Sequence, residues 1–173
     1  MKLLSLLSLV LIIQIASCKK NSLSIKDSPL TTCPENAECS YVFTEHSDIQ
    51  SNGLIQGDYR VFKSVIQIPV FSYKQESTLW IKAPMQSDEF LLRPDEIKNG
   101  FVKYLNSDIL LRNTVDLKPV GGFVKGKNLS PGNPADQTKW LIEAEIIMAT
   151  VEGNMPLDTL HLKQYFYPNF VYD

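Results

Sequence analysis

Two glutamates with the spacing of a strand face are the first residues that could do chemistry. Glu143 and Glu145 lie in residues 140–148, a segment in which every even position is apolar. Residues two apart on a β-strand share a face and lie roughly 6.5 to 7 Å apart, which suits the carboxylate pair of a glycoside hydrolase. The competing interpretation is a solvated sheet face with Lys163 diagonal to Glu145 across a hairpin. We favour the solvated face and assign no catalytic residue.

The two histidines of the chain are also candidates for chemistry. His46 is followed by Ser47 and Asp48, the residue types of a hydrolytic triad. Triad members are recognised by geometry and seldom come from sequence neighbours, so we expect a polar turn that leaves the first strand. His161 is distant in sequence and shares the face of Glu143 and Glu145. No nucleophile elbow, phosphate loop, zinc pair or calcium loop is present, and we predict no metal and no cofactor.

The carboxy-terminal segment QYFYPNFVY is the best candidate for binding. Tyr165, Tyr167 and Tyr172 could stack against a sugar or a peptide, since amphipathic rings give a large contact area at low entropic cost. Trp80 is a further candidate for the same neighbourhood. The competing interpretation, which we favour, is a terminal strand that closes the core with tyrosine hydroxyls at its rim.

The amino end has the pattern of a secretory signal peptide. Lys2 is followed by a nearly unbroken apolar stretch over residues 3–13. Eleven helical residues reach roughly 16 Å, about half of a hydrocarbon core of about 30 Å, so the stretch is too short to span a bilayer. A charged start, a short apolar middle and small residues before a break are typical of a cleaved leader. A buried helix of the domain is the alternative, and the absence of a polar face disfavours it.

Ile15-Ala16-Ser17-Cys18 refines this interpretation. It resembles the lipobox of bacterial lipoproteins, in which a branched aliphatic residue and two small residues precede an acylated cysteine. The resemblance covers only about the first eighteen residues and implies that Cys18 becomes the first residue and carries acyl chains. Two or three chains would hold the protein at the membrane durably. In lipoproteins of enteric type, aspartate after the cysteine retains the protein at the inner membrane, so Lys19 implies the outer membrane if the cell has one.

Two cysteines remain in CPENAEC. An exported compartment favours a Cys33–Cys39 disulfide, which would stabilise the fold by roughly 2 to 2.5 kcal/mol in the chain-entropy treatment. Free thiols are one alternative, and a metal site with His46 and His161 is another. Zinc sites usually space paired cysteines by two to four residues, so we expect the disulfide.

Composition indicates one folded domain behind a tether. We expect a leader at residues 1–17, a serine- and threonine-rich flexible tether at 18–32 and a single β domain at 33–173. With 44% hydrophobic residues the chain can form a core. The formal charge is −2, without the basic stripe that nucleic-acid binding needs.

Period-two alternation predicts strands almost throughout. Pro69 predicts an edge or a bulge at the end of one strand, and three glycines predict a bulge in residues 120–127. In RPDEIKNGF we favour a helical turn over residues 94–98, while an Asn99-Gly100 hairpin remains the alternative. The expected strands cover residues 40–45, 59–71, 77–83, 101–105, 109–115, 120–127, 140–148 and 160–166.

The last two segments predict a hairpin with a defined register. A turn centred near Met155 would set Met148 opposite Leu162 and Ala149 opposite His161, with both apolar sets on one face. Seven to nine strands without a long helix predict an all-β fold, either an antiparallel sandwich or a small barrel.

These observations predict a lipid-anchored, extracytoplasmic β domain that binds an envelope protein or a glycan. A carboxylate-dependent hydrolase and a purely structural envelope lipoprotein are the alternatives.

Overall fold

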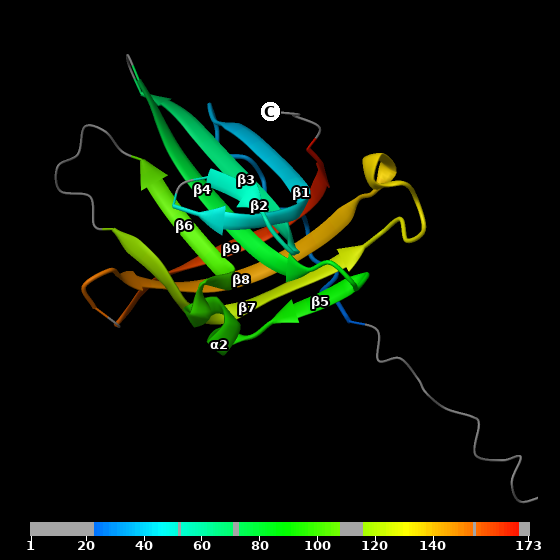
Figure 1. Ribbon diagram of the computed structural model, residues 1–173. Helices are drawn as coiled ribbons and strands as arrows, with labels where there is room; N and C mark the ends of the chain where they lie inside the picture. Colours follow the sequence, from blue (N-terminus) through cyan, green and yellow to red (C-terminus); the bar gives the residue numbers. More distant parts are fainter. Residues whose placement is uncertain (1–22, 52, 71–72, 108–115, 154, 170–173) are drawn as a thin grey trace, which may run out of the picture.

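The protein forms a single curled β-sheet. The computed structural model describes residues 23–51, 53–70, 73–107, 116–153 and 155–169. Within these residues nine strands form one sheet, and the all-β prediction is confirmed (Figure 1). The strands are β1 (Glu38–Gln50), β2 (Gly53–Gln56), β3 (Tyr59–Val70), β4 (Tyr73–Pro84), β5 (Glu89–Leu92), β6 (Val102–Ser107), β7 (Leu117–Asn128), β8 (Trp140–Thr150) and β9 (Pro156–Pro168).

The sheet curls into a half-barrel. The strand order is β5-β7-β8-β9-β1-β3-β4-β6, and β2 pairs with β1 outside this path. Curling brings β6 near β7, and the short helical segments α2 (Pro94–Glu96) and η2 (Ile97–Phe101) lie beside them. All pairs are antiparallel except β1 with β9, where Val42 lies opposite Tyr167. The sheet is therefore mixed, because the first and last long strands run side by side in the same direction.

The core lies between the two halves of the curled sheet. Phe62 of β3 contacts the rings of Phe43, Phe90, Trp140 and Phe166, with ring centroids 5.5 to 5.8 Å apart. The apolar even positions of β8 all point into this core, as the period-two pattern predicts. The aromatic cluster therefore joins β1, β3, β5, β8 and β9.

The polar turn predicted at His46, Ser47 and Asp48 is wrong. These residues lie inside β1, at a bulge between Thr44 and Ser47 where His46 has a φ of 52°. A bulge bends a strand without ending it. The chain can then continue to Gln50 and pair with β2, a short strand that the sequence pattern did not reveal.

The helical turn between β5 and β6 is confirmed, and the Asn99-Gly100 hairpin is excluded. Pro94 occupies the first helical position, and the Glu96 carboxylate accepts a hydrogen bond from the Arg93 amide at 2.7 Å. This contact satisfies one of the amides that a helix start leaves free. Gly100 ends the turn with a φ of 85°, a conformation that glycine adopts without strain.

The β8–β9 hairpin is confirmed, but its predicted register is wrong. Leu162 lies opposite Ala144, not Met148, and His161 lies opposite Glu145, not Ala149. The chain reverses nearer Gly153, whose amide donates to the Thr150 carbonyl at 3.1 Å, and a bulge follows Met148. Because the register moves by an even number of residues, the apolar sets still share the core face.

Three further expectations concern irregular strands. The predicted bulge in β7 is present between Pro119 and Gly121. The described ladder between β1 and β3 ends at Gln67, and Pro69 lies two residues beyond it. The amide that proline lacks therefore removes no hydrogen bond to β1. The strand predicted at residues 109–115 lies outside the described residues. The connection between β7 and β8 contains one short turn, η3 (Ala135–Gln137).

Candidate functional site

An apolar pocket lies inside the half-barrel and was not foreseen from the sequence. Its volume is about 260 Å³, and its walls come from β1, which contributes Tyr41, and from β3, β4, β6 and β9. Ile66 and Ile68 come from β3, Leu79 from β4, and Leu160 and Leu162 from β9. Strand alternation points these side chains inward. Because β9 does not pair with β4 or β6, the space between the walls remains open here. We call this cavity the half-barrel pocket.

Hydroxyl groups supply most of the polarity of the half-barrel pocket. Tyr104 of β6 donates to the Ser77 hydroxyl at 3.3 Å, and the buried Ser64 lies beside them in the lining. Burial raises the pKa of Tyr41, so this hydroxyl stays neutral. Among the described lining residues there is no carboxylate, lysine or arginine, and His161 is the one titratable base. A cavity of this kind suits a small apolar molecule with few polar groups.

The segment before β1 completes the pocket wall. Residues 23–32, which we call the strap, cross the outer face of β7–β9 and end beside β9. The Thr31 amide donates to the Lys163 carbonyl oxygen, and the Thr31 hydroxyl accepts from the Lys163 amide, each at 2.8 Å. Thr31, Thr32 and Pro34 then line the half-barrel pocket. The strap is the described part of the expected tether, and its contacts hold it against the sheet.

The disulfide follows directly on the strap. Cys33 and Cys39 are joined, with Cα atoms 6.0 Å apart. The bond ties the strap to the beginning of β1, and Cys39 lies opposite Ile66 in the ladder with β3. The predicted pairing is confirmed, and it lies next to the pocket wall formed by Pro34.

One of the two carboxylates considered for hydrolysis, Glu143, binds the strap instead. Glu143 is only 7% exposed, because the strap covers it, so the predicted solvated face is wrong at this residue. Its Oε2 accepts from the Lys26 amide and from the Lys125 ammonium, each at 3.4 Å. Lys163 lies diagonal to Glu145 as expected, but its ammonium donates to the carbonyl oxygens of Lys26 and Ser28. An open hollow of about 370 Å³ remains beside Glu145 and His161.

The structure brings two of the four platform candidates together. Tyr165 and Tyr167 share the outer face of β9, and the Lys139 ammonium lies 3.6 Å and 5.6 Å from their ring centroids. Lys139 therefore occupies one face of Tyr165, whereas Tyr167 stays half exposed. Trp80 lies on β4, three strands from Tyr167 in the same row, about 14 Å by strand spacing. It is 3% exposed and does not join them, and Tyr172 is outside the described residues.

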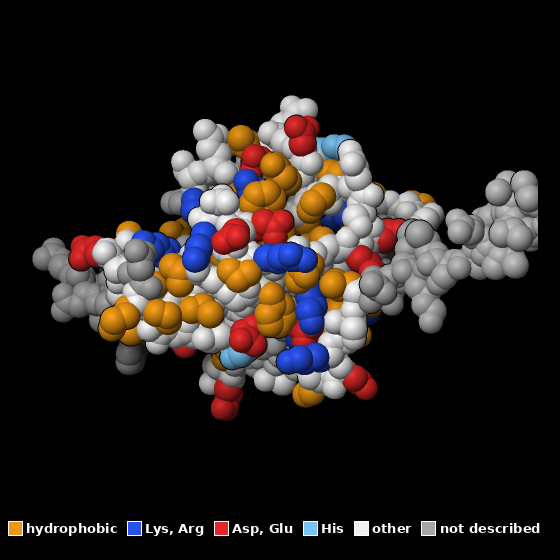
Figure 2. Space-filling view, turned by 90° about the horizontal axis from the view of Figure 1, so that it is seen from below, with side chains coloured by type: hydrophobic (Ala, Val, Ile, Leu, Met, Phe, Trp, Pro, Cys, Tyr) orange, Lys and Arg blue, Asp and Glu red, His pale blue; other side chains and the backbone are white. Residues whose placement is uncertain are grey.

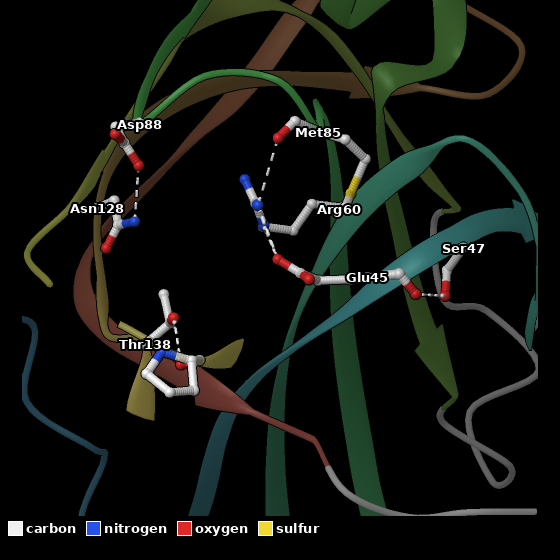
Figure 3. Close-up of polar contacts among 8 residues, drawn as sticks. Glu45, Ser47, Arg60, Met85, Asp88, Asn128 and Thr138 are labelled. Atoms are coloured by element: carbon white, nitrogen blue, oxygen red, sulfur yellow. Dashed lines mark hydrogen bonds and ion pairs between the residues drawn. The ribbon is translucent and has the colours of Figure 1, made fainter. Parts of the chain in front are cut away.

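A buried ion pair lies at the end of the half-barrel away from the pocket. Figure 3 shows Arg60 directed at Glu45, whose Oε1 accepts from Nε at 3.0 Å and from Nη2 at 2.7 Å. The guanidinium carbon also lies 4.4 Å from the centroid of the Trp140 ring. The remaining amino group of Arg60, Nη1, and the indole Nε1 of Trp140 are buried without a hydrogen-bond partner among the described residues. The arrangement closes this end of the core with a charged pair, in which Arg60 is buried and the Glu45 side chain is 27% exposed.

Within the described ranges, no three histidine, cysteine, aspartate or glutamate side chains come together as a metal site. No helix in the same ranges is long and apolar enough to cross a bilayer. Cys18 lies outside the described residues, so its acylation stays a prediction.

Comparison with known proteins adds no relative. No protein-family model, no curated protein and no solved structure matches this chain.

Proposed function

We propose that this protein is a lipid-anchored binding module of the cell envelope that holds a small apolar ligand in the half-barrel pocket. The leader and the lipobox at Ile15-Ala16-Ser17-Cys18 support the anchor and the extracytoplasmic location. The Cys33–Cys39 disulfide supports the same location, because oxidising compartments preserve such bonds.

The observation that carries the binding role is the chemistry of the half-barrel pocket. Its strand-borne walls are mostly aliphatic and aromatic, and hydroxyls of Ser64, Ser77 and Tyr104 provide a few points of orientation. Transfer of an apolar ligand from water would contribute roughly 25 cal/mol per Å² of buried surface. A charged ligand would lose its hydration without gaining a counter-ion among the described lining residues. The ligand class is therefore a neutral or weakly polar hydrophobic molecule.

Hydrolysis is less well supported. The Glu143 carboxylate bonds to the strap and to Lys125, so it is not free to act on a substrate while the strap is docked. In the hollow beside Glu145 and His161, the described hydroxyl of Ser28 accepts a hydrogen bond from the Lys163 ammonium, which acts there as a donor and not as a base. A binding role needs only the pocket that is already formed.

Ligand binding is tested by filling the pocket. We expect the neutral probe N-phenyl-1-naphthylamine to bind saturably to the purified chain and to be displaced by an envelope lipid extract. Ile68→Trp places an indole in the pocket and should weaken binding at least about tenfold, since the added volume occupies the ligand space. Ile55→Trp is the matched control, because Ile55 is an exposed residue of β2 outside the pocket lining. Equal binding in both variants would rule out the half-barrel pocket as the site.

The anchor is tested separately by mass and fractionation. We expect the intact mass of the chain, expressed with its own leader in a bacterial host, to show loss of residues 1–17 and added acyl chains on Cys18. Cys18→Ser should shift the protein from membranes to soluble fractions, and density separation should place the acylated form in the outer membrane of a host that has one. A chain that begins at Met1 and carries no acyl mass would refute the anchor and leave the pocket assay unaffected.

A further inference from the structure

We infer that Val151, Met155 and Leu157, where β8 ends and β9 begins, insert into the surface of the bilayer that carries the anchor, so that the membrane holds the domain at two points. This inference rests on the proposed acyl anchor at Cys18. It assigns a membrane contact to a part of the chain far in sequence from that anchor. We call Val151, Met155 and Leu157 the apolar tip.

The apolar tip exposes an unusual amount of hydrophobic surface for one turn. Val151 is 52% exposed, Met155 82% and Leu157 62%. Together with the exposed Pro156 they are separated from the core by the bulge after Met148. Clustered exposed apolar side chains mark interaction sites more often than single ones do. Figure 2 shows hydrophobic side chains gathered at the left end of the lower face, where Figure 1 places the β8–β9 turn.

The surroundings of the apolar tip suit the boundary between lipid and water. A hollow of about 600 Å³ beside it has an apolar floor of Pro119, Val120 and Ile147, with Lys98 and Lys118 at its sides. The Lys118 ammonium donates to the Val151 carbonyl at 3.0 Å and so braces the turn. Amphipathic lysines at the headgroup level accompany apolar residues that enter a membrane surface.

The charge near the apolar tip favours apolar insertion over electrostatic capture. Three exposed acidic residues lie near the apolar tip in sequence or on a neighbouring strand: Asp116, Glu152 and Asp158. Their negative charge offsets the positive charge of Lys98 and Lys118. A surface selected for anionic lipid would carry a basic excess. The occupant is therefore the bilayer interface itself, entered by hydrophobic side chains.

The position of the anchor relative to the strap makes this contact reachable. The strap begins at Leu23, whose amide donates to Glu89 of β5 at 2.7 Å. Leu23 follows Cys18 by five positions, a reach of at most about 18 Å. An undocked tether of residues 18–32 would allow a much greater height. Docking of the strap therefore keeps this end of the domain close to the bilayer.

The apolar tip lies at the other end of the same strands. Glu89, which binds the first residue of the strap, lies in the same row of the sheet as Lys127 and Leu141. Val151 follows Leu141 by ten residues, which corresponds to about 33 Å along the direction of β8. Both ends lie on the lower side of the molecule in Figure 1, with β7 and β8 running between them. An anchored domain that lies with these strands along the membrane brings the tip to the surface. Three side chains bind weakly alone, but the anchor raises their effective concentration there.

The test measures the environment of the apolar tip directly. Met155→Cys and the control Ile55→Cys are each labelled with an environment-sensitive fluorophore in the acylated full chain, with the Cys33–Cys39 disulfide kept oxidised. The labelled proteins are incorporated into vesicles of phosphatidylethanolamine and phosphatidylglycerol. We expect a blue shift and quenching by spin-labelled lipid at position 155 and neither effect at position 55. Equal signals at the two positions would overturn the inference.

Companion measurements separate this inference from the proposed anchor. Intact mass reports acylation, so an acylated chain without a shift at position 155 overturns the tip contact and leaves the anchor standing. If acylation is absent, Cys18→Ser is added so that the fluorophore labels only position 155 or position 55, and the chain is mixed with excess vesicles. A shift confined to position 155 then supports the tip contact without the anchor, and no shift overturns the inference together with the anchor on which it rests. Leu157→Asp in the labelled chain should abolish the shift at position 155. A shift that is absent with these lipid vesicles and occurs only with vesicles that also contain envelope protein would overturn the bilayer as the occupant.

Discussion

Gly122 illustrates how single residues set the geometry of β7. Its φ is 98°, and a Cβ atom there would lie 1.9 Å from the Glu145 carbonyl oxygen of the neighbouring strand. The position thus combines a backbone conformation that disfavours side chains with a close approach of two strands. The three glycines of residues 120–127 predicted a bulge correctly, but only the fold shows that Gly122 lies against the backbone of β8 and Gly126 against the Phe90 ring.

We predict that Gly122→Ala destabilises the protein by roughly 2 to 4 kcal/mol, the sum of backbone strain and overpacking. Gly53→Ala is the matched control, since no atom lies within 4 Å of a Cβ built there. The free energy of unfolding from urea titrations measures both variants. A loss at Gly122 no larger than that at Gly53 would contradict the prediction.

At the scale of elements, one ion pair joins the end of β1 to β4. The Asp48 carboxylate lies 3.1 Å from the Lys82 ammonium of β4, and Figure 1 shows β2 crossing in front of β3 and β4. Partial burial alone would raise the pKa of Asp48. Hydrogen bonds from the Ile49 amide and Lys82, with the charge of Lys82, outweigh burial and lower it below 3.8. The pair therefore stabilises the fold above the unfolded-state pKa, and this contribution is lost as the pH falls through the folded-state pKa.

We predict that Asp48→Asn lowers the free energy of unfolding by up to about 1 kcal/mol near neutral pH. The difference from the unmodified protein should vanish in acid, where Asp48 is protonated in both folded and unfolded chains. Urea titrations over a series of pH values measure this. Glu38→Gln is the control, because the Lys74–Glu38 pair is largely exposed and should contribute little. A difference that persists in acid would show that the carboxylate charge is not responsible.

A second element-scale prediction concerns the Cys33–Cys39 loop. Reduction should lower the free energy of unfolding by about 2 to 2.5 kcal/mol, because the reduced unfolded chain is less constrained. The Cys33→Ser, Cys39→Ser double variant should match the reduced protein and not respond to reductant. Calorimetry with and without reductant measures both. A reductant response in the double variant would assign the effect to something other than this bond.

At the scale of the whole molecule, the strap links the proposed anchor at Cys18 to the half-barrel pocket. It bonds to β5 through Glu89, to β8 through Glu143 and to β9 through Lys163, then lines the half-barrel pocket with Thr31. A pull on the anchor would therefore act on the pocket wall. The expected flexible tether did not anticipate this, because its polar composition is also that of an exposed loop.

We predict that Lys163→Met loosens the strap while the sheet stays intact. The side chain loses its donors to the carbonyl oxygens of Lys26 and Ser28, whereas the β9 backbone bonds remain. Amide exchange measured by mass spectrometry should become faster in residues 24–31 and stay unchanged in β8. Lys74→Met is the control, since Lys74 bonds to Glu38 and Gln67 away from the strap. Equal strap exchange in both variants would show that Lys163 does not hold it.

Local patterns determined the all-β class, the inward side of β8 and β9, the helical turn at Pro94 and the cysteine pairing, because alternation, capping and loop closure act over a few residues. The same reasoning misjudged the hairpin register and the bulge at His46, where turn geometry decides between alternatives that keep the core side chains facing inward. The tertiary structure alone decided the parallel pairing of β1 with β9, the docking of the strap over Glu143 and the half-barrel pocket. Each of these depends on contacts between segments far apart in sequence, which no local period encodes.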